Sequence, residues 1–239
     1  MPVSVSSVPI VYRDKRREFR FPTASKSGIS QTLRGESYPH IQFISDVRVV
    51  VDIGASVGSA ALFFSLVYPD ATVYCFEPHA DSFDLLTRNV SGIEQIRAFN
   101  FGLYDTNKTA KLHIGLTTFT TNSIHRAVDK NEPTENVSLR DAKAAMREIG
   151  LDRIDVIKVD TEGCEVQILK SLLPHYRAKV IHLEYHNDDD RRAIDHLLCD
   201  DFLLFAGRVL RPHLGEVTYV RRDAFPSTIE RDRSSRGLY

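Results

Sequence analysis

V-R-V-V-V-D-I-G-A-S-V-G, from Val47 to Gly58, is the stretch from which the architecture of the chain can be predicted. Three consecutive valines are typical of a parallel strand that is buried on both faces. Asp52 and two glycines follow, and the apolar residues 59–66 then predict a helix. A glycine-spaced turn at a helix N-terminus exposes backbone N–H groups and lets a ligand approach closely. The stretch therefore indicates a pocket for a nucleotide-like ligand.

The residues between the glycines indicate which ligand that is. A dinucleotide-binding turn reads G-x-G-x-x-G, whereas Gly54 and Gly58 stand in D-x-G-x-x-x-G with Ser56 where the middle glycine would be. Asp52 before the turn would repel a pyrophosphate, but it suits the cationic amino group and sulfonium of S-adenosylmethionine. We therefore expect S-adenosylmethionine, and an NAD-linked oxidoreductase is the enzymatic alternative.

A second acid supports this interpretation. Residues 72–76 predict a short strand that ends in Glu77 and Pro78. A carboxylate at the end of the second strand can bind both ribose hydroxyls. Singly, Asp52 could be a turn cap and Glu77 a solvated strand end, but the pair at matching strand ends favours a cofactor site. After a third predicted strand, Gly102 either borders the adenine or forms a structural turn.

The remaining chain alternates predicted strands and helices. We expect strands at 95–101, 154–160 and 180–186, a closing hairpin of 202–209 and 216–220, helices at 80–90, 137–150, 166–173 and 188–198, and an extra strand at 111–114 before an insertion at 117–135. This alternation predicts a doubly wound α/β sheet with ligands at the carboxyl ends of its strands.

Three segments are expected along the chain. Residues 1–45 form an N-terminal extension, in which Gly35, Glu36 and Tyr38 are placed to fold over the pocket. Residues 46–222 form the main domain, and residues 223–239 form a polar C-terminal tail.

Composition narrows the class of protein. The 239 residues, 42% of them apolar, can bury one sizeable core, and the formal net charge of −1 argues against a nucleic-acid binder that depends on a basic field. The basic cluster Arg13 to Arg20 is expected to be a solvated face. No apolar run is long enough for a membrane span or a signal peptide. Three separated cysteines predict neither disulfides nor a zinc site, which is typical of a cytoplasmic protein.

Four motifs together resemble one family. They are D-I-G-A-S-V-G at 52–58, F-E-P at 76–78, I-K-V-D-T-E-G-C-E at 157–165 and L-E-Y-H at 183–186. They are similar to the FkbM-type methyltransferases, a class I S-adenosylmethionine-dependent family, and the resemblance covers 38–220. It implies a seven-stranded sheet with a reversed last strand and O-methylation of hydroxyls on small molecules or sugars. It also implies that Asp52, Gly54, Ala55, Gly58 and Glu77 contact the cofactor, and Pro78 and Gly102 join them by position.

Candidate catalytic residues follow the fourth and fifth predicted strands. Methyl transfer to a hydroxyl needs proximity, orientation and a base. We expect His186 or Asp160 to remove the proton, with Glu162 and Glu184 beside them. The alternatives are a structural histidine and acids that stabilise a helix N-terminus. The Asn/Asp-Pro-Pro-aromatic motif of base amine methylation is not found after the fourth predicted strand, which favours oxygen as the acceptor atom.

The reaction needs a single base, but the sequence offers four carboxylates here: Asp160, Glu162, Glu165 and Glu184. Proton uptake, a basic substrate or a divalent cation would relieve their repulsion. Their spacing matches no metal motif, so a divalent metal is the less favoured of these explanations. The alternative from another class is a methyltransferase fold that binds a nucleoside-like ligand or a partner without turnover. The acceptor and the oligomeric state stay open.

Overall fold

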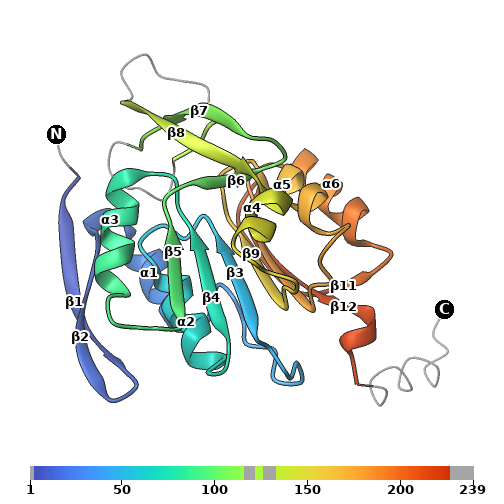
Figure 1. Ribbon diagram of the computed structural model, residues 1–239, viewed down its shortest axis with the longest axis horizontal. Helices are drawn as coiled ribbons and strands as arrows, with labels where there is room; N and C mark the ends of the chain where they lie inside the picture. Colours follow the sequence, from blue (N-terminus) through green and yellow to red (C-terminus); the bar gives the residue numbers. More distant parts are fainter. Residues whose placement is uncertain (1–2, 116–121, 126–132, 227–239) are drawn as a thin grey trace.

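The computed structural model describes residues 3–115, 122–125 and 133–226 (Figure 1). Its elements in chain order are β1 (Val5–Tyr12), β2 (Lys15–Pro22), η1 (Thr23–Ser25), α1 (Lys26–Leu33), β3 (Val49–Ile53), α2 (Ser59–Val67), β4 (Thr72–Phe76), α3 (Ala80–Asn89), β5 (Ile96–Phe99), β6 (Gly102–Tyr104), β7 (Lys108–His113), β8 (Thr134–Asp141), α4 (Ala142–Glu148), β9 (Val156–Val159), α5 (Glu165–Leu172), β10 (Val180–Tyr185), α6 (Asp188–Leu198), β11 (Phe202–Arg211), β12 (Leu214–Arg221) and η3 (Arg222–Ala224).

A seven-stranded sheet forms the centre, in the order β11-β12-β10-β9-β3-β4-β5. β12 runs antiparallel to β10 and β11, and the pairs from β10 to β5 are parallel. The expected doubly wound sheet with a reversed last strand is therefore confirmed. Since the parallel strands end at one edge, the residues that follow β3, β4, β9 and β10 meet there.

Two apolar cores cover the two faces of the sheet. On one face α1, α2, α3 and the β1–β2 hairpin pack against alternate residues such as Val50 and Val73. On the other face α4, α5 and α6 pack against the intervening residues, such as Val51 and Ile157. Strands buried on both faces explain the continuous apolar runs from which the strands were predicted.

The N-terminal extension is more structured than its sequence indicated. Arg13 to Arg20, expected to be a solvated face, contribute the turn and most of the second strand of a hairpin that pairs Val5 with Pro22. Phe19 is fully buried, and the backbone of Arg20 exchanges two 2.8 Å hydrogen bonds with the Asn89 side chain of α3. Most charged side chains of β2 are exposed, as expected for a solvated face. The other side of the strand carries buried aromatic side chains, which the sequence did not indicate.

The predicted helix 137–150 begins too early. Residues 134–141 instead form β8, which joins β6 and β7 in a three-stranded sheet. Val137 and Leu139 are buried on one side of this strand, which is a period of two rather than a helical period. Helix α4 starts at Ala142, and Asp141 caps it by accepting a 2.7 Å hydrogen bond from the N–H of Ala144.

Two expected segments fall largely outside the described residues. The insertion at 117–135 is described only at 122–125 and 133–135, and the tail at 223–239 only as far as 226. The first tail residues pack rather than extend into solvent, because the ring of Phe225 lies 5.3 Å from that of Phe43 between centroids. Among the described helices, none has the length and apolar content that crossing a bilayer requires.

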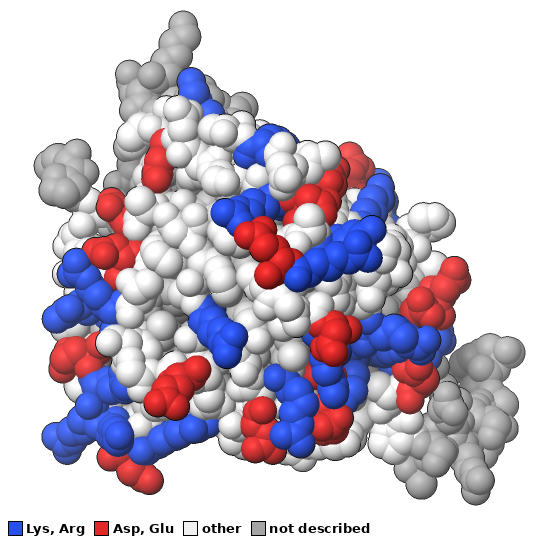
Figure 2. All heavy atoms as spheres, in the orientation of Figure 1, with Lys and Arg blue, Asp and Glu red and all other residues white. Residues whose placement is uncertain are grey.

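The surface carries charges of both signs. On the face drawn in Figure 2, lysine and arginine side chains are interspersed with aspartate and glutamate. This mixing agrees with the formal net charge of −1 for the chain.

Candidate active site

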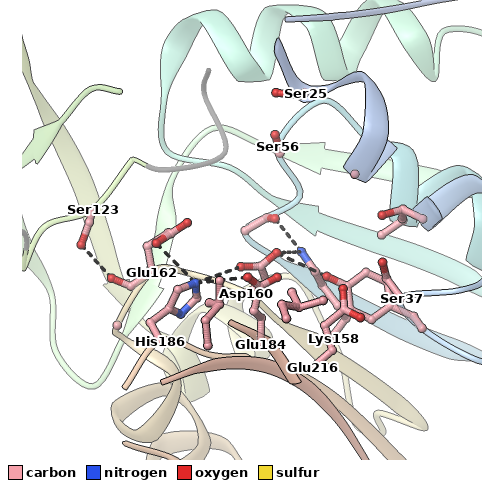
Figure 3. Close-up of a pocket in the computed structure, with 18 of the residues that line it drawn as sticks. Ser25, Ser37, Ser56, Ser123, Lys158, Asp160, Glu162, Glu184, His186 and Glu216 are labelled. Carbon is pink, nitrogen blue, oxygen red and sulfur yellow. Dashed lines mark hydrogen bonds and ion pairs between the residues drawn. The ribbon is translucent and has the colours of Figure 1, made fainter. Parts of the chain in front are cut away.

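A cavity of about 910 Å³ opens at the carboxyl ends of β3, β9 and β10 (Figure 3). Its walls are the turn after β3, α1 with the residues that follow it, and the end of the β11–β12 hairpin. Asp160, Glu162, Glu184 and His186 all line it. An adjoining cavity of about 100 Å³ is lined by Glu77, Pro78, Gly102 and Leu103. The structure thus brings the catalytic candidates together, and four cofactor candidates line the adjoining cavity: Gly54, Glu77, Pro78 and Gly102.

The glycines of the turn are required by the packing of the protein itself. Gly54 has a φ of +75°, and a Cβ there would lie 1.9 Å from the carbonyl oxygen of Asp160. At Gly58, with a φ of +89°, a Cβ would lie 2.6 Å from Leu86. The N–H groups of Gly54 and Ala55 donate to the carbonyl of Phe76 at 3.0 and 3.1 Å. The turn is therefore pressed onto the ends of β9 and β4, and it forms one wall of the cavity.

Asp52 lies beneath the turn rather than at the cavity surface. Its side chain is fully buried, and its Oδ1 is 3.1 Å from the Nζ of Lys158 on the neighbouring strand. Burial raises the pKa of Asp52, while Lys158 opposes that shift. The same Nζ donates to the carbonyl of Gly54 at 2.6 Å. Asp52 therefore pairs with a cation of the protein itself. In the sequence, the lysine within the otherwise apolar run I-K-V-D is the signal that could have indicated this ion pair.

Glu77 lines the smaller cavity, where backbone N–H groups hold its carboxylate. Its two carboxylate oxygens accept hydrogen bonds from the N–H of Ser56 at 2.8 Å and of His79 at 2.9 Å. Burial raises the pKa of Glu77 to about 7, and the two N–H donors oppose that shift. Pro78 and Gly102 are its neighbours in the wall, where a Cβ on Gly102 would lie 2.5 Å from Leu139.

His186 sits inside a ring of carboxylates. Its Nε2 lies 3.3 Å from Glu162, 3.6 Å from Glu184 and 4.0 Å from Asp160, and its Nδ1 lies 3.6 Å from Glu165. Figure 3 shows His186, Glu162, Asp160 and Glu184 converging from the ends of β9 and β10. Adjacent parallel strands deliver these residues to one point, as the sequence predicted.

Burial and these close contacts shift the pKa values of His186, Glu184 and Glu162. Burial alone lowers the pKa of His186, but its contacts with Glu162 and Glu165 raise it to about 11, so the imidazole is a cation at neutral pH. Burial, reinforced by the Asp160 carboxylate, raises the pKa of Glu184 to about 8. Burial also raises the pKa of Glu162, against the effect of His186.

Glu165 has a structural role. It is fully buried and accepts hydrogen bonds from the N–H of Thr161 at 2.8 Å and of Gly163 at 3.0 Å. The Thr161 hydroxyl adds a third bond at 3.1 Å. This acid therefore fixes the loop between β9 and α5, which positions Asp160 and Glu162.

The N-terminal extension supplies Tyr38, which the sequence placed over the pocket, and Ser37, which it did not. The hydroxyl of Tyr38 donates to Asp160 Oδ2 at 3.3 Å, and burial raises the pKa of Tyr38, so this hydroxyl remains a donor. Ser37 lies beside it in the cavity wall (Figure 3). Of the three residues expected over the pocket, Tyr38 lines it, while Gly35 packs on Phe63 and Glu36 is exposed.

One group of side chains has donor atoms that suit a divalent cation. A carboxylate oxygen of Asp160, one of Glu184 and a ring nitrogen of His186 lie within 4.8 Å of one another. Two carboxylates and an imidazole fit such an ion chemically. The imidazole would first have to lose the proton that the surrounding acids stabilise, so the fit is conditional on that loss.

Comparison with known proteins gives a family match. Residues 52–210 match the sequence profile described as "Methyltransferase FkbM domain". The chain is 27% identical over 154 residues to "Methyltransferase sdnD" of Sordaria araneosa, covering 52% of this chain and 60% of that protein. It is 25% identical over 154 residues to "Hexuronic acid methyltransferase AglP" of Haloferax volcanii, covering 64% and 62%. The chain thus spans less than two thirds of either relative.

Two solved structures share the fold. A fibrillarin pre-rRNA processing protein of Methanococcus jannaschii has a TM-score of 0.55 at 13% identity, over 90% of this chain and 82% of that one. Aeropyrum pernix fibrillarin, solved with natively bound S-adenosyl-L-methionine, has a TM-score of 0.52 at 14% identity, over 92% and 84%. At these identities the similarity concerns the fold alone.

Proposed function

The chain belongs to the FkbM methyltransferase family, and we propose that it transfers the methyl group of S-adenosylmethionine to a hydroxyl of a small molecule or sugar. The observation that carries this proposal is the convergence of Asp160 and His186 in one cavity beside the Gly54–Gly58 turn. A relative named as a hexuronic acid methyltransferase supports a sugar-like acceptor.

The cofactor lies across the turn in this proposal. Pro78, Gly102 and Leu103 in the smaller cavity would hold the adenine, and Glu77 would bind the ribose hydroxyls. Residues 54–56 and Ser59, which line the larger cavity together with Asp160, would hold the methionine part. Asp52 contributes indirectly, because it holds Lys158 against the turn.

The methyl group moves in a single displacement. The acceptor oxygen bonds to the methyl carbon as the carbon–sulfur bond breaks, and the electron pair of that bond stays on sulfur to give S-adenosylhomocysteine. Asp160 takes the hydroxyl proton, because His186 already holds one. Glu162 and Glu184 hold the His186 imidazolium in place, with its Nε2 4.0 Å from Asp160. His186 would be the base only after it had lost its proton.

A divalent cation is not required by this scheme. If one binds, Asp160, Glu184 and His186 would hold it, and it would orient and acidify the acceptor hydroxyl. The His186 imidazolium already neutralises part of the same negative charge, which supports proton sharing instead. Activity measured after exhaustive chelation separates the two: full activity supports the metal-free scheme, and a loss that Mg²⁺ restores supports the cation.

The acceptor is proposed to be a small molecule rather than a nucleic acid. Mixed surface charges and an acid-lined cavity would both disfavour a polyphosphate backbone. Calorimetry with S-adenosylmethionine and with NADH, followed by a screen of hydroxylated compounds for release of S-adenosylhomocysteine, tests the proposal. Cofactor binding without release from any acceptor would favour a non-catalytic binding module, and tight NADH binding would favour the oxidoreductase.

A further inference from the structure

We propose, resting on the function above, that Tyr38 is a positioning residue for the base. Its hydroxyl holds Asp160 Oδ2, and Asp160 Oδ1 is then the oxygen that takes the proton of the acceptor. Tyr38 lies outside residues 52–210, the part of the chain that matches the family profile. The N-terminal extension thus completes the active site in addition to forming one of its walls.

The two carboxylate oxygens of Asp160 have different surroundings. Oδ2 accepts a 3.3 Å hydrogen bond from the Tyr38 hydroxyl and lies 3.9 Å from the Nζ of Lys158. Oδ1 lies 4.0 Å from the Nε2 of His186, which is beyond hydrogen-bond distance. Within the part of the chain that the structure describes, no group donates a hydrogen bond to Oδ1. Since a donor already occupies Oδ2, Oδ1 is the oxygen with free lone pairs for a proton.

The Tyr38 hydroxyl is suited to donate and unsuited to act as the base itself. Burial, reinforced by the Asp160 carboxylate, raises the pKa of Tyr38 well above its ordinary value, so the phenol keeps its proton at neutral pH. It can therefore hold Oδ2 throughout the transfer. In that step the O–H bond of the acceptor breaks, its proton goes to Oδ1, and its electron pair bonds to the methyl carbon as sulfur leaves.

Packing gives the Tyr38 hydroxyl a fixed direction. The residue is 4% exposed, and the centroid of its ring lies 6.0 Å from that of Phe64 on α2 and 5.8 Å from that of His182 on β10. The chain reaches this place through a turn at Gly35, where φ is +73° and a Cβ would lie 2.6 Å from Phe63. A base must be held in a defined geometry to be effective, and a ring that α2 and β10 both contact can supply it.

The test uses the whole chain, S-adenosylmethionine and the compound that releases S-adenosylhomocysteine fastest in the screen of hydroxylated compounds. Tyr38→Phe removes the hydroxyl and keeps the ring. Its kcat per folded protein, with folding followed by urea, should fall about tenfold, because the base stays but loses its positioning. The KM of the acceptor and the calorimetric affinity for S-adenosylhomocysteine should stay within about twofold of the parent values.

Tyr176→Phe is the matched control. The Tyr176 hydroxyl is also buried, and it donates to the carbonyl of Leu151 at 3.2 Å, outside both cavities. Its removal should leave kcat unchanged.

A second comparison shows whether Tyr38 acts through Asp160. In the Asp160→Asn background, Tyr38→Phe should change kcat by less than about twofold, because the base that it positions is already absent. A purely structural role would lower kcat by the same factor in both backgrounds.

The outcomes separate the two proposals. If the parent methylates no compound of the screen, the proposed function fails, and the role of Tyr38 fails with it. If the parent turns over and Tyr38→Phe has the same kcat, only the role of Tyr38 is overturned. An equal loss in the Asp160→Asn background, or a loss that Tyr176→Phe matches, overturns it as well.

Discussion

Lys158 of β9 stands opposite Asp52 of β3 in the parallel ladder, and its Nζ lies 3.1 Å from Asp52 Oδ1. Both side chains are buried, and the Nζ also donates to the carbonyl of Gly54. The ion pair therefore fixes the turn on the end of β9. In the proposed cofactor site, the acid of the first motif would therefore contribute through the conformation of that turn.

Removing one partner of this pair should destabilise the fold strongly. Lys158→Met leaves Asp52 buried without its cation, which typically costs about 3 to 5 kcal/mol. Urea unfolding measures the loss, and Lys170→Met on the exposed side of α5 is the matched control, expected near zero. A Lys158→Met protein as stable as the parent would show that the pair does not hold the turn.

Glu77→Ala should weaken S-adenosylmethionine binding. Loss of a charge-assisted contact to the ribose is worth about 1.5 to 3 kcal/mol, or roughly ten- to a hundredfold in affinity. Because Glu77 also accepts from the N–H of Ser56, the unfolding free energy should be measured beside the calorimetric titration. Unchanged affinity in a folded variant would remove Glu77 from the cofactor site.

The His186 imidazolium, which carboxylates surround, should make the free energy of unfolding depend on pH. The pKa of His186 is raised in the folded chain to about 11 from 6.5. Its contribution is therefore fully present below pH 6.5 and is lost as pH rises towards 11. We expect the difference in unfolding free energy between the parent and His186→Gln to shrink across this range, as followed by urea unfolding at several pH values. A difference that stays constant would mean that the acids do not hold a proton on His186.

Asp160→Asn should keep cofactor affinity and lose turnover. A positioned base contributes about a hundred- to ten-thousandfold, so a loss of that size is expected in kcat. Asp189→Asn, at an exposed position of α6, provides the control. Turnover equal to the parent would return Asp160 to the alternative of a helix N-terminal acid.

The inner strands of the central sheet could be predicted from the sequence because they are buried on both faces. Runs such as residues 49–53 and 156–159 are apolar apart from the paired Asp52 and Lys158, and short glycine turns mark their ends. The same strand order also predicted that Asp160 and His186 would meet. These are consequences of local pattern and parallel connection, which a single sequence carries.

Other features depend on contacts that the sequence does not display. β2 is rich in charge, so its buried Phe19 and Phe21 were not recognised as one face of a strand. Residues 137–141 predict the start of a helix, because Ser138 followed by Asp141 is typical of a capping box, but in the structure they end β8. The role of Tyr38 depends on a contact 122 residues away in the chain, with Asp160. Such pairings are set by tertiary packing rather than by local propensity.

Methyl transfer to oxygen is the central claim, and following the transferred carbon tests it most directly. The chain is incubated with S-adenosylmethionine labelled with ¹³C in the methyl group and with a panel of hydroxylated sugars that includes aminated ones, and the products are examined by NMR and mass spectrometry. The account predicts a labelled methoxy carbon in an acceptor, formed in equal amount with S-adenosylhomocysteine and absent with Asp160→Asn. Label found on nitrogen or carbon, or label that stays on a bound cofactor with every acceptor, would contradict it.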